Sequence, residues 1–213
     1  MPVFAVVAPG ETAGMRSTEY GEANEMNTNV ARHDTVHPEL EAMRFPVEEE
    51  AQAHRARYVW GVTRIALGWT FMWAFLDKAF GLGFATASED AWINGGSPTF
   101  GFLNFATEGK VFHDFFASIS GPVADWAFML GLLGLGVALL LGIGTRIAAI
   151  TGSLLMVSMW AAELGLENNP FMDDHIIYAL VLVGLAIAGA GRYIGLGRQW
   201  ERLTTVKRYP ILK

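Results

Sequence analysis

The chain contains no cysteine among its 213 residues. This absence excludes disulfide bonds, thiol nucleophiles, iron–sulfur ligation and thiolate metal sites. Any redox chemistry must therefore use a bound organic group or a metal that a partner protein holds. Charge is also scarce, because only 17% of the residues are charged while 52% are hydrophobic. That balance is typical of membrane proteins.

Basic residues are too few to form a nucleic-acid surface. The formal net charge is −6, and residues 1–57 contribute −5 of it, with ten acidic and five basic residues. The rest of the chain is almost neutral, which excludes a nucleic-acid partner on charge grounds. Outside residues 1–57 the only histidines are His113 and His175. We therefore expect no metal site in this chain.

Long apolar stretches set the predicted fold. Four of them approach the ~20 residues that a helix needs to cross a bilayer. They are Tyr58–Leu76, Pro122–Gly144, Ile147–Ala162 extended to Leu166, and Asp174–Gly191. The sequence therefore predicts an all-α membrane protein, with a four-transmembrane-helix bundle over residues 58–192.

The segments outside the bundle differ in composition. Residues 1–57 are expected to form an acidic cytoplasmic tail, largely disordered or docked on a partner, with a short helix over residues 38–57 as an alternative. The segment Met1–Gly10 has no basic region and makes a poor signal peptide. Residues 193–213 are expected to form a basic cytoplasmic extension.

The positions of the basic residues predict an orientation. Arginines flank one end of every predicted span, whereas the opposite side has only Lys78 and Lys110. By the positive-inside rule, both termini are cytoplasmic. We therefore expect a multi-pass protein of a prokaryotic cell membrane. The flanking arginines are Arg55, Arg57, Arg146, Arg192, Arg198 and Arg202.

The longest predicted connection is the exterior loop, residues 77–121. Its centre, Trp92-Ile93-Asn94-Gly95-Gly96-Ser97-Pro98-Thr99, has the composition of turns. Towards its end, apolar residues from Val111 to Ile119 follow helical spacing. This pattern predicts a short helix lying in the outer membrane interface.

Ionisable residues gather at the exterior ends of the predicted helices. Asp173, Asp174 and His175 directly precede sixteen uncharged residues, and Asp77 and Glu163 fall at the same level. Charged groups beside a membrane-length helix are costly and often functional. Tryptophans lead to two of these acids at helical spacing. Trp69 and Trp73 precede Asp77, Trp160 precedes Glu163, and Tyr178 shares a helix face with Asp174.

An aromatic slot closed by carboxylates and a histidine suits a quinone headgroup, which needs hydrogen-bond donors and proton-exchanging groups. We therefore predict proton-handling residues at Asp77, Glu163, Asp174 and His175. Trp69, Trp73, Trp160 and Tyr178 are predicted to flank the ring. Simpler interpretations exist for each residue. Asp173 or Asp174 can cap a helix, the tryptophans can anchor at the interface, and Asp77 with Lys78 can be an exposed ion pair.

Two further charged residues have structural interpretations. Arg64 lies about 9 Å into the first predicted span, from six residues at ~1.5 Å each. Its side chain is expected to reach back to cytoplasmic headgroups, because no acid lies at its depth on the other helices. Asp125 lies in the first turn after Pro122, where capping explains it.

Several motifs resemble the DoxX/DoxD-like family of membrane proteins. They are Leu76-Asp77-Lys78, the segment 92–99 followed by Gly101-Phe102-Leu103, the segment from Gly142 to Ala149, and the segment from Asp173 to Leu180. The resemblance covers about residues 58–202 and is closest to DoxD. It implies a four-helix membrane bundle that acts as the membrane subunit of a thiosulfate:quinone oxidoreductase-like complex. A DoxA-like partner is then expected to be a separate chain.

Two functions from different classes follow. The first is a quinone-interacting membrane subunit of a respiratory oxidoreductase complex, which passes electrons from a partner-bound donor such as thiosulfate to menaquinone or ubiquinone. Its partners are then membrane lipids, quinone and other subunits. The alternative is a non-catalytic accessory or assembly subunit of a respiratory chain supercomplex. A small transporter ranks last, because the second and fourth predicted helices carry no ionisable residue in mid-membrane.

Overall fold

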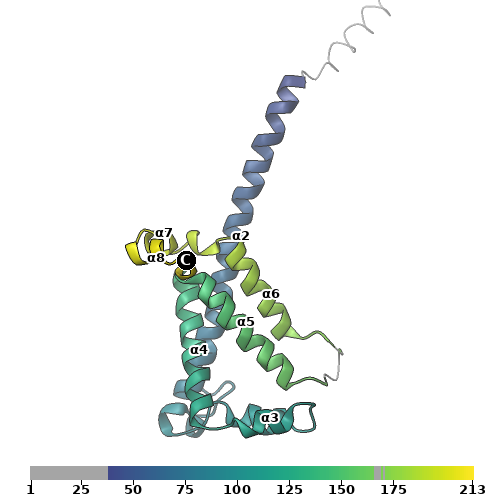
Figure 1. Ribbon diagram of the computed structural model, residues 1–213, viewed down its shortest axis with the longest axis vertical. Coiled ribbons are helices and arrows are strands. Elements are labelled where there is room, and N and C mark those ends of the chain that lie inside the picture. The colour runs from purple at the N-terminus through teal and green to yellow at the C-terminus, as the bar shows by residue number, and fades with distance from the viewer. Residues whose placement is uncertain (1–37, 166–168, 170) are drawn as a thin grey trace, which may run out of the picture. The chain divides into compact units, whose positions relative to one another are not determined.

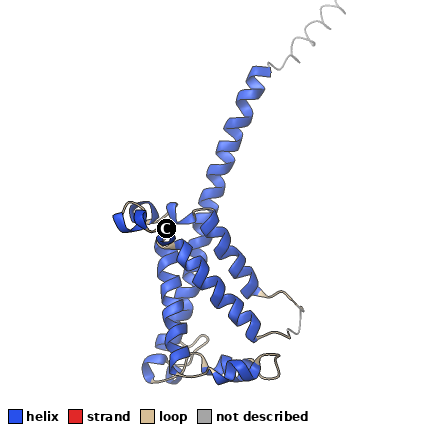
Figure 2. Ribbon diagram, viewed as in Figure 1, coloured by secondary structure: helices blue, strands red, loops and turns tan. Residues whose placement is uncertain are grey.

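The computed structural model describes residues 38–165, 169 and 171–213. Contacts divide the chain into Met1–Ala51 and Gln52–Lys213, and the sites below all lie in the second unit. The described residues form helices and connecting turns without a strand (Figure 2). The predicted all-α fold class is therefore confirmed for them. Residues 1–37 of the predicted tail lie outside the described part of the chain.

Three helices are long and apolar enough to cross a membrane (Figure 1). They are α2 (Pro38–Phe80), whose membrane-length part is Glu49–Phe80, α4 (Pro122–Leu141) and α5 (Thr145–Ala162). This finding indicates a membrane protein. The fourth predicted span appears as α6 (Asp174–Ile187), which has only 14 residues. At ~1.5 Å per residue, α6 is about 21 Å long, less than the ~30 Å hydrocarbon core of a bilayer.

The ends of the first helix differ from the prediction. Residues 38–57, assigned to the tail with a short helix as the alternative, are helical as that alternative predicted, and the helix continues into the first predicted span. The helix also runs on to Phe80, so Asp77 and Lys78 lie in its last turn rather than in the loop. The loop boundary at residue 77 was therefore wrong by about one turn. Hydrophobicity alone does not mark this end, because the charged pair interrupts the apolar pattern before the helix stops.

Glycines allow the helices to approach closely. A Cβ added to Gly68 of α2 would lie 2.8 Å from the Leu139 side chain of α4, and one added to Gly136 of α4 would lie 2.9 Å from Met72. Gly152 of α5 likewise faces Leu135 and Leu182, which come from the helices on either side. In lipid the hydrophobic effect does not draw helices together. Small residues instead let helices approach closely and gain van der Waals contacts. The four helices therefore pack through one apolar core.

The exterior loop folds into short helical pieces. They are η1 (Ser88–Asp90), η2 (Trp92–Asn94), the π-helical η3 (Phe102–Ala106) and α3 (His113–Ser118). The predicted helix near the end of the loop therefore exists, although it has six residues.

A carboxylate on α4 anchors this loop. Oδ1 of Asp125 accepts hydrogen bonds from the Ser97 hydroxyl at 2.8 Å, the Thr99 hydroxyl at 2.6 Å and the Thr99 backbone N–H at 3.1 Å. Asp125 is only 7% exposed, and α4 has no side-chain cap. The capping interpretation of Asp125 was therefore wrong. The carboxylate serves the loop 26 residues earlier in the chain, a contact that no local pattern reveals.

Short helices close the opposite end of the bundle. They are η4 (Ala190–Arg192), α7 (Gly197–Trp200), α8 (Thr204–Arg208) and η5 (Pro210–Leu212). The Leu196 N–H donates to the Leu141 carbonyl at 2.8 Å, and the Arg146 N–H donates to the Lys213 carbonyl at 2.8 Å. The C-terminal segment is thus tied to the end of α4 and to the start of α5.

Arg64 of α2 lies inside this end and does not reach outward. Its side chain is 0% exposed, and its guanidinium donates to the carbonyls of Leu139, Leu140, Tyr193 and Ile194. The expectation that Arg64 reaches the headgroups was therefore wrong. The last carbonyls of a helix have no partner within the helix and carry a partial negative charge. They stabilise the guanidinium in place of the missing acid.

Candidate functional site

Asp77, the first predicted proton-handling residue, is a buried loop anchor. It is 2% exposed, and its carboxylate accepts from the Phe84 N–H at 3.3 Å and the Ala85 N–H at 3.0 Å. No hydrogen bond or ion pair within the described residues links Asp77 to Glu163, Asp174 or His175. The two backbone N–H donors stabilise the negative charge of the carboxylate. The same two hydrogen bonds fix the start of the exterior loop to the end of α2.

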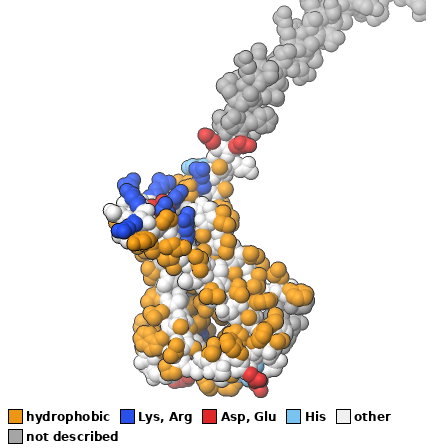
Figure 3. Space-filling view, in the orientation of Figure 1, with side chains coloured by type: hydrophobic (Ala, Val, Ile, Leu, Met, Phe, Trp, Pro, Cys, Tyr) orange, Lys and Arg blue, Asp and Glu red, His pale blue; other side chains and the backbone are white. Residues whose placement is uncertain are grey.

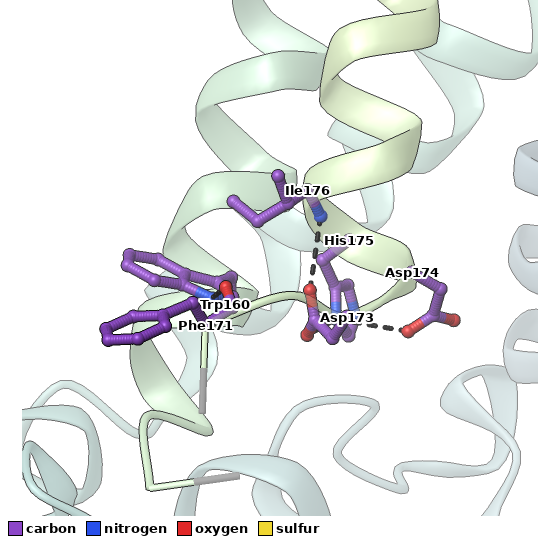
Figure 4. Close-up of polar contacts among 6 residues, drawn as sticks. All are labelled: Trp160, Phe171, Asp173, Asp174, His175 and Ile176. Atoms are coloured by element: carbon purple, nitrogen blue, oxygen red, sulfur yellow. Dashed lines mark hydrogen bonds and ion pairs between the residues drawn. The ribbon is translucent and has the colours of Figure 1, made fainter. Parts of the chain in front are cut away.

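The other predicted acids meet between α5 and α6. Figure 4 shows Asp173 and His175 together at the start of α6, with Asp174 on one side and Trp160 on the other. Nδ1 of His175 lies 2.8 Å from Oδ2 of Asp173, whose Oδ1 accepts from the Ile176 N–H. Asp173 is therefore the N-cap of α6. Asp174 is 72% exposed and lies 3.8 Å from the same histidine nitrogen.

Glu163 lies beside this pair at the C-terminal end of α5. Ligand atoms of Glu163, Asp173 and His175 all lie within 4.8 Å of one another. Carboxylates and an imidazole are ligands that zinc and similar divalent cations accept. The cluster is thus the group of described residues that could hold a metal, although the sequence predicted none. Its carboxylates and imidazole can equally accept and release protons.

The predicted aromatic residues divide into two groups. Trp69 and Trp73 of α2 lie 6.0 Å apart between ring centroids, and Trp73 stacks edge-on against Phe84 at 5.1 Å. Nε1 of Trp160 instead donates to the Phe171 carbonyl at 3.0 Å (Figure 4). Tyr178 packs against the apolar core. Trp73 therefore packs against the start of the exterior loop, Trp69 lies beside Trp73 on α2, and Trp160 joins α5 to the segment before α6.

An apolar cavity lies elsewhere, under the exterior loop. Its volume is about 280 Å³, and its walls come from the end of α2, the loop, α4 and α5. Such a volume is just under the ~300 Å³ at which small-molecule sites begin. Lys78 of α2 is the one charged residue on its walls. The apolar and aromatic wall residues include Phe102, Leu103, Phe116, Phe128, Leu155 and Met159.

Two hydroxyl groups on the cavity walls already donate hydrogen bonds within the protein. The Thr99 hydroxyl donates to Asp125 at 2.6 Å, and the Ser158 hydroxyl donates to the Leu154 carbonyl at 2.8 Å. In the part of the chain that the structure describes, no carboxylate lies within ion-pair distance of the Lys78 ammonium. Lys78 is therefore the wall side chain with donors to offer a ligand.

Sequence reasoning missed this cavity. None of the eight predicted site residues lines it, and Lys78 was considered only as a surface partner of Asp77. One signal was present, because Lys78 is one of two basic residues in the predicted exterior segments. The walls themselves could not be predicted, since they join residues 98–119 to α4 and α5.

Comparisons with protein-family models, with curated proteins and with solved structures found no match to this chain.

Proposed function

We propose that this protein is a quinone-interacting membrane subunit of an oxidoreductase complex, similar to DoxD, and that it binds the quinone headgroup in the cavity beside Lys78. The observation that carries the proposal is an apolar cavity of about 280 Å³ whose wall includes the Lys78 ammonium, which forms no ion pair with a carboxylate of the described residues. This site replaces the slot predicted between the first, third and fourth helices.

The chemistry of the cavity suits a quinone ring. Phenylalanine side chains and Leu155 offer apolar contact for the ring and its isoprenoid tail. The Lys78 ammonium offers a donor to one carbonyl oxygen, and charge-assisted hydrogen bonds of this kind are among the stronger ones. Small-molecule sites commonly combine such apolar walls with few polar groups.

Reduction of a quinone to a quinol takes up two electrons and two protons. With no cysteine in this chain, we expect the electrons from a donor bound to a partner subunit, such as thiosulfate. Lys78 would hold the carbonyl oxygen where charge develops. In the orientation predicted from the arginines, Glu163, Asp174 and His175 would exchange protons with the exterior.

Quinone binding by the purified full chain tests this proposal. The dissociation constants of a short-chain ubiquinone and a short-chain menaquinone would be measured in detergent for the wild type, Lys78→Met and Lys110→Met. Loss of a hydrogen bond to a charged group costs about 1.5–3 kcal/mol, which corresponds to roughly a tenfold or greater loss of affinity. We expect this loss for Lys78→Met.

Lys110→Met is the matched control, since Lys110 is a lysine of the exterior loop outside the cavity. Its ammonium donates to the Gly165 carbonyl at 3.3 Å. The control should bind quinone like the wild type. A wild-type chain that binds neither quinone would contradict the proposal and would favour the non-catalytic accessory role. Equal affinities of wild type and Lys78→Met would contradict this placement of the site.

A further inference from the structure

The C-terminal segment, residues 193–213, presents a basic and apolar surface at one end of the bundle. It contains five basic residues and one acidic residue. Figure 3 shows Lys and Arg side chains gathered around α7 and α8, with hydrophobic side chains directly beside them. The exposed apolar side chains of the segment include Ile194, Leu196, Leu203, Tyr209 and Ile211.

Within the described residues, Glu201 and Arg192 form the one ion pair at this surface. Nε of Arg192 donates to both carboxylate oxygens of Glu201, at 2.9 and 3.0 Å. This pairing raises the pKa of the Arg192 guanidinium. Arg198 lies over the Tyr193 ring and Arg208 over the Tyr209 ring, at 5.8 and 5.6 Å from the centroids. Aromatic rings thus hold these two arginines in place, and no carboxylate among the described residues pairs with them.

The surface is fixed to the bundle. Arg64 holds the carbonyls of Tyr193 and Ile194 from inside, and Leu196 is bonded to the end of α4. Val206 of α8 is buried. Because the backbone is anchored, the basic side chains stay at the level where the membrane helices end.

A polar cleft opens beside Arg198. Its volume is about 300 Å³, and Tyr58, Arg192 and Gln199 are also on its walls. A phosphate group fits such a cleft chemically, because guanidinium groups bind phosphate oxygens through paired N–H donors.

We propose that residues 193–213 bind the headgroups of anionic phospholipids, with the cleft at Arg198 as the principal headgroup site. Basic residues attract anionic lipid surfaces, and adjacent apolar side chains insert at the same level. The proposal depends on the membrane placement of the helices and is independent of quinone binding.

Lipid selectivity of the full chain tests this proposal. The protein would be reconstituted in vesicles of phosphatidylcholine and phosphatidylglycerol in equal amounts. Electron paramagnetic resonance would then compare how strongly the protein restricts spin-labelled phosphatidylglycerol and spin-labelled phosphatidylcholine. The variants are R198Q/R202Q/R208Q and R198K/R202K/R208K. All three arginines are exposed, so neither variant disturbs the core.

We expect the wild type to prefer phosphatidylglycerol and the glutamine variant to lose most of that preference, at roughly fivefold per charge removed. The lysine variant keeps the charge and should keep most of the preference. A preference that the glutamine variant retains would overturn the proposal, as would a wild type that does not distinguish the two lipids. The latter result would favour an acidic protein as the partner of this surface.

The wild type alone provides a second measurement, which does not depend on how the variants fold. Added salt should lower its preference for phosphatidylglycerol, because exposed charges are screened. A salt-independent preference would contradict the proposal. Quinone affinity should be the same in wild type and glutamine variant, so failure of one proposal is distinguishable from failure of the other.

Discussion

Both ends of the helix bundle contain buried charged side chains, and the sign of the charge is opposite at the two ends. At one end the buried cation Arg64 donates to four backbone carbonyls. At the other end the buried anions Asp77 and Asp125 accept from backbone N–H and hydroxyl groups of the exterior loop. Among the described residues, none of these three groups has an ion-pair partner of opposite charge.

The difference lies in what each buried charge holds. Arg64 ties the end of α4 to the segment after α6, so it joins elements of the bundle itself. The two aspartates hold the exterior loop, which forms part of the wall of the Lys78 cavity. At one end the buried charge therefore joins helices to the C-terminal segment, and at the other the buried charges hold a loop that lines a cavity.

Substitution of Arg64 should have the largest effect. Arg64→Met leaves four carbonyls without their donor, and each hydrogen bond to a charged group is worth about 1.5–3 kcal/mol. We expect a loss of at least about 3 kcal/mol in the free energy of unfolding, measured by thermal or denaturant unfolding in detergent. The free energy of unfolding of Arg64→Lys should lie between those of the wild type and Arg64→Met, since one ammonium cannot reach all four carbonyls with the same geometry.

Arg57→Met is the matched control, because Arg57 is an exposed arginine on the same helix. It should change stability by less than about 0.5 kcal/mol. Equal stability of Arg64→Met and Arg57→Met would contradict the assignment of Arg64 as the buried tie between α2, α4 and the C-terminal segment.

Asp125→Ala should have a smaller effect at the opposite end. It removes three hydrogen bonds from the loop but leaves the helix contacts intact, so we expect a loss of about 1–3 kcal/mol in stability. Because Thr99 is a wall residue of the cavity, quinone affinity should fall as well. Limited proteolysis should cut the loop of the variant faster than that of the wild type.

A loop that resists proteolysis equally in both proteins would show that Asp125 is not its anchor. Asp114→Ala is a suitable control, because Asp114 is an exposed acid of the same loop region on α3. It should leave both the proteolysis rate and quinone affinity unchanged.

The smallest effects are expected at the adjacent pair Asp173 and Asp174. Asp173→Ala removes the N-cap of α6 and should cost about 1 kcal/mol in stability. Asp174→Ala removes an exposed carboxylate and should change stability by less than about 0.5 kcal/mol. Unfolding measurements on the two variants provide the test, and a larger effect at Asp174 would contradict the geometry at the start of α6.

Periodic and compositional features of the sequence predicted part of this structure. The apolar stretches placed α4 and α5 within a few residues, and the helical spacing after Val111 anticipated α3. The last predicted span was too long, because Gly189 adopts φ +61° and helps to end the helical run after Ile187.

Long-range contacts account for what sequence reasoning missed. Burial of Arg64 was expected to require an acidic partner at the same depth. Its partners are instead backbone carbonyls, which the sequence does not distinguish because every residue type has one. Asp125 seemed to be a local cap, whereas its partners lie 26 and 28 residues earlier. The Glu163, Asp173 and His175 cluster was partly predicted, since helix ends at one membrane level bring such residues together.

Photoaffinity labelling with an azido-substituted quinone tests whether the quinone headgroup occupies the cavity beside Lys78. The purified full chain would be labelled, digested and analysed by mass spectrometry, with excess unmodified quinone as competitor. We expect competed labels in the cavity walls, on peptides that contain Phe102, Phe116, Phe128 or Leu155. Competed labels confined to the segment from Trp160 to Tyr178 would contradict this expectation and would restore the site first predicted from the sequence.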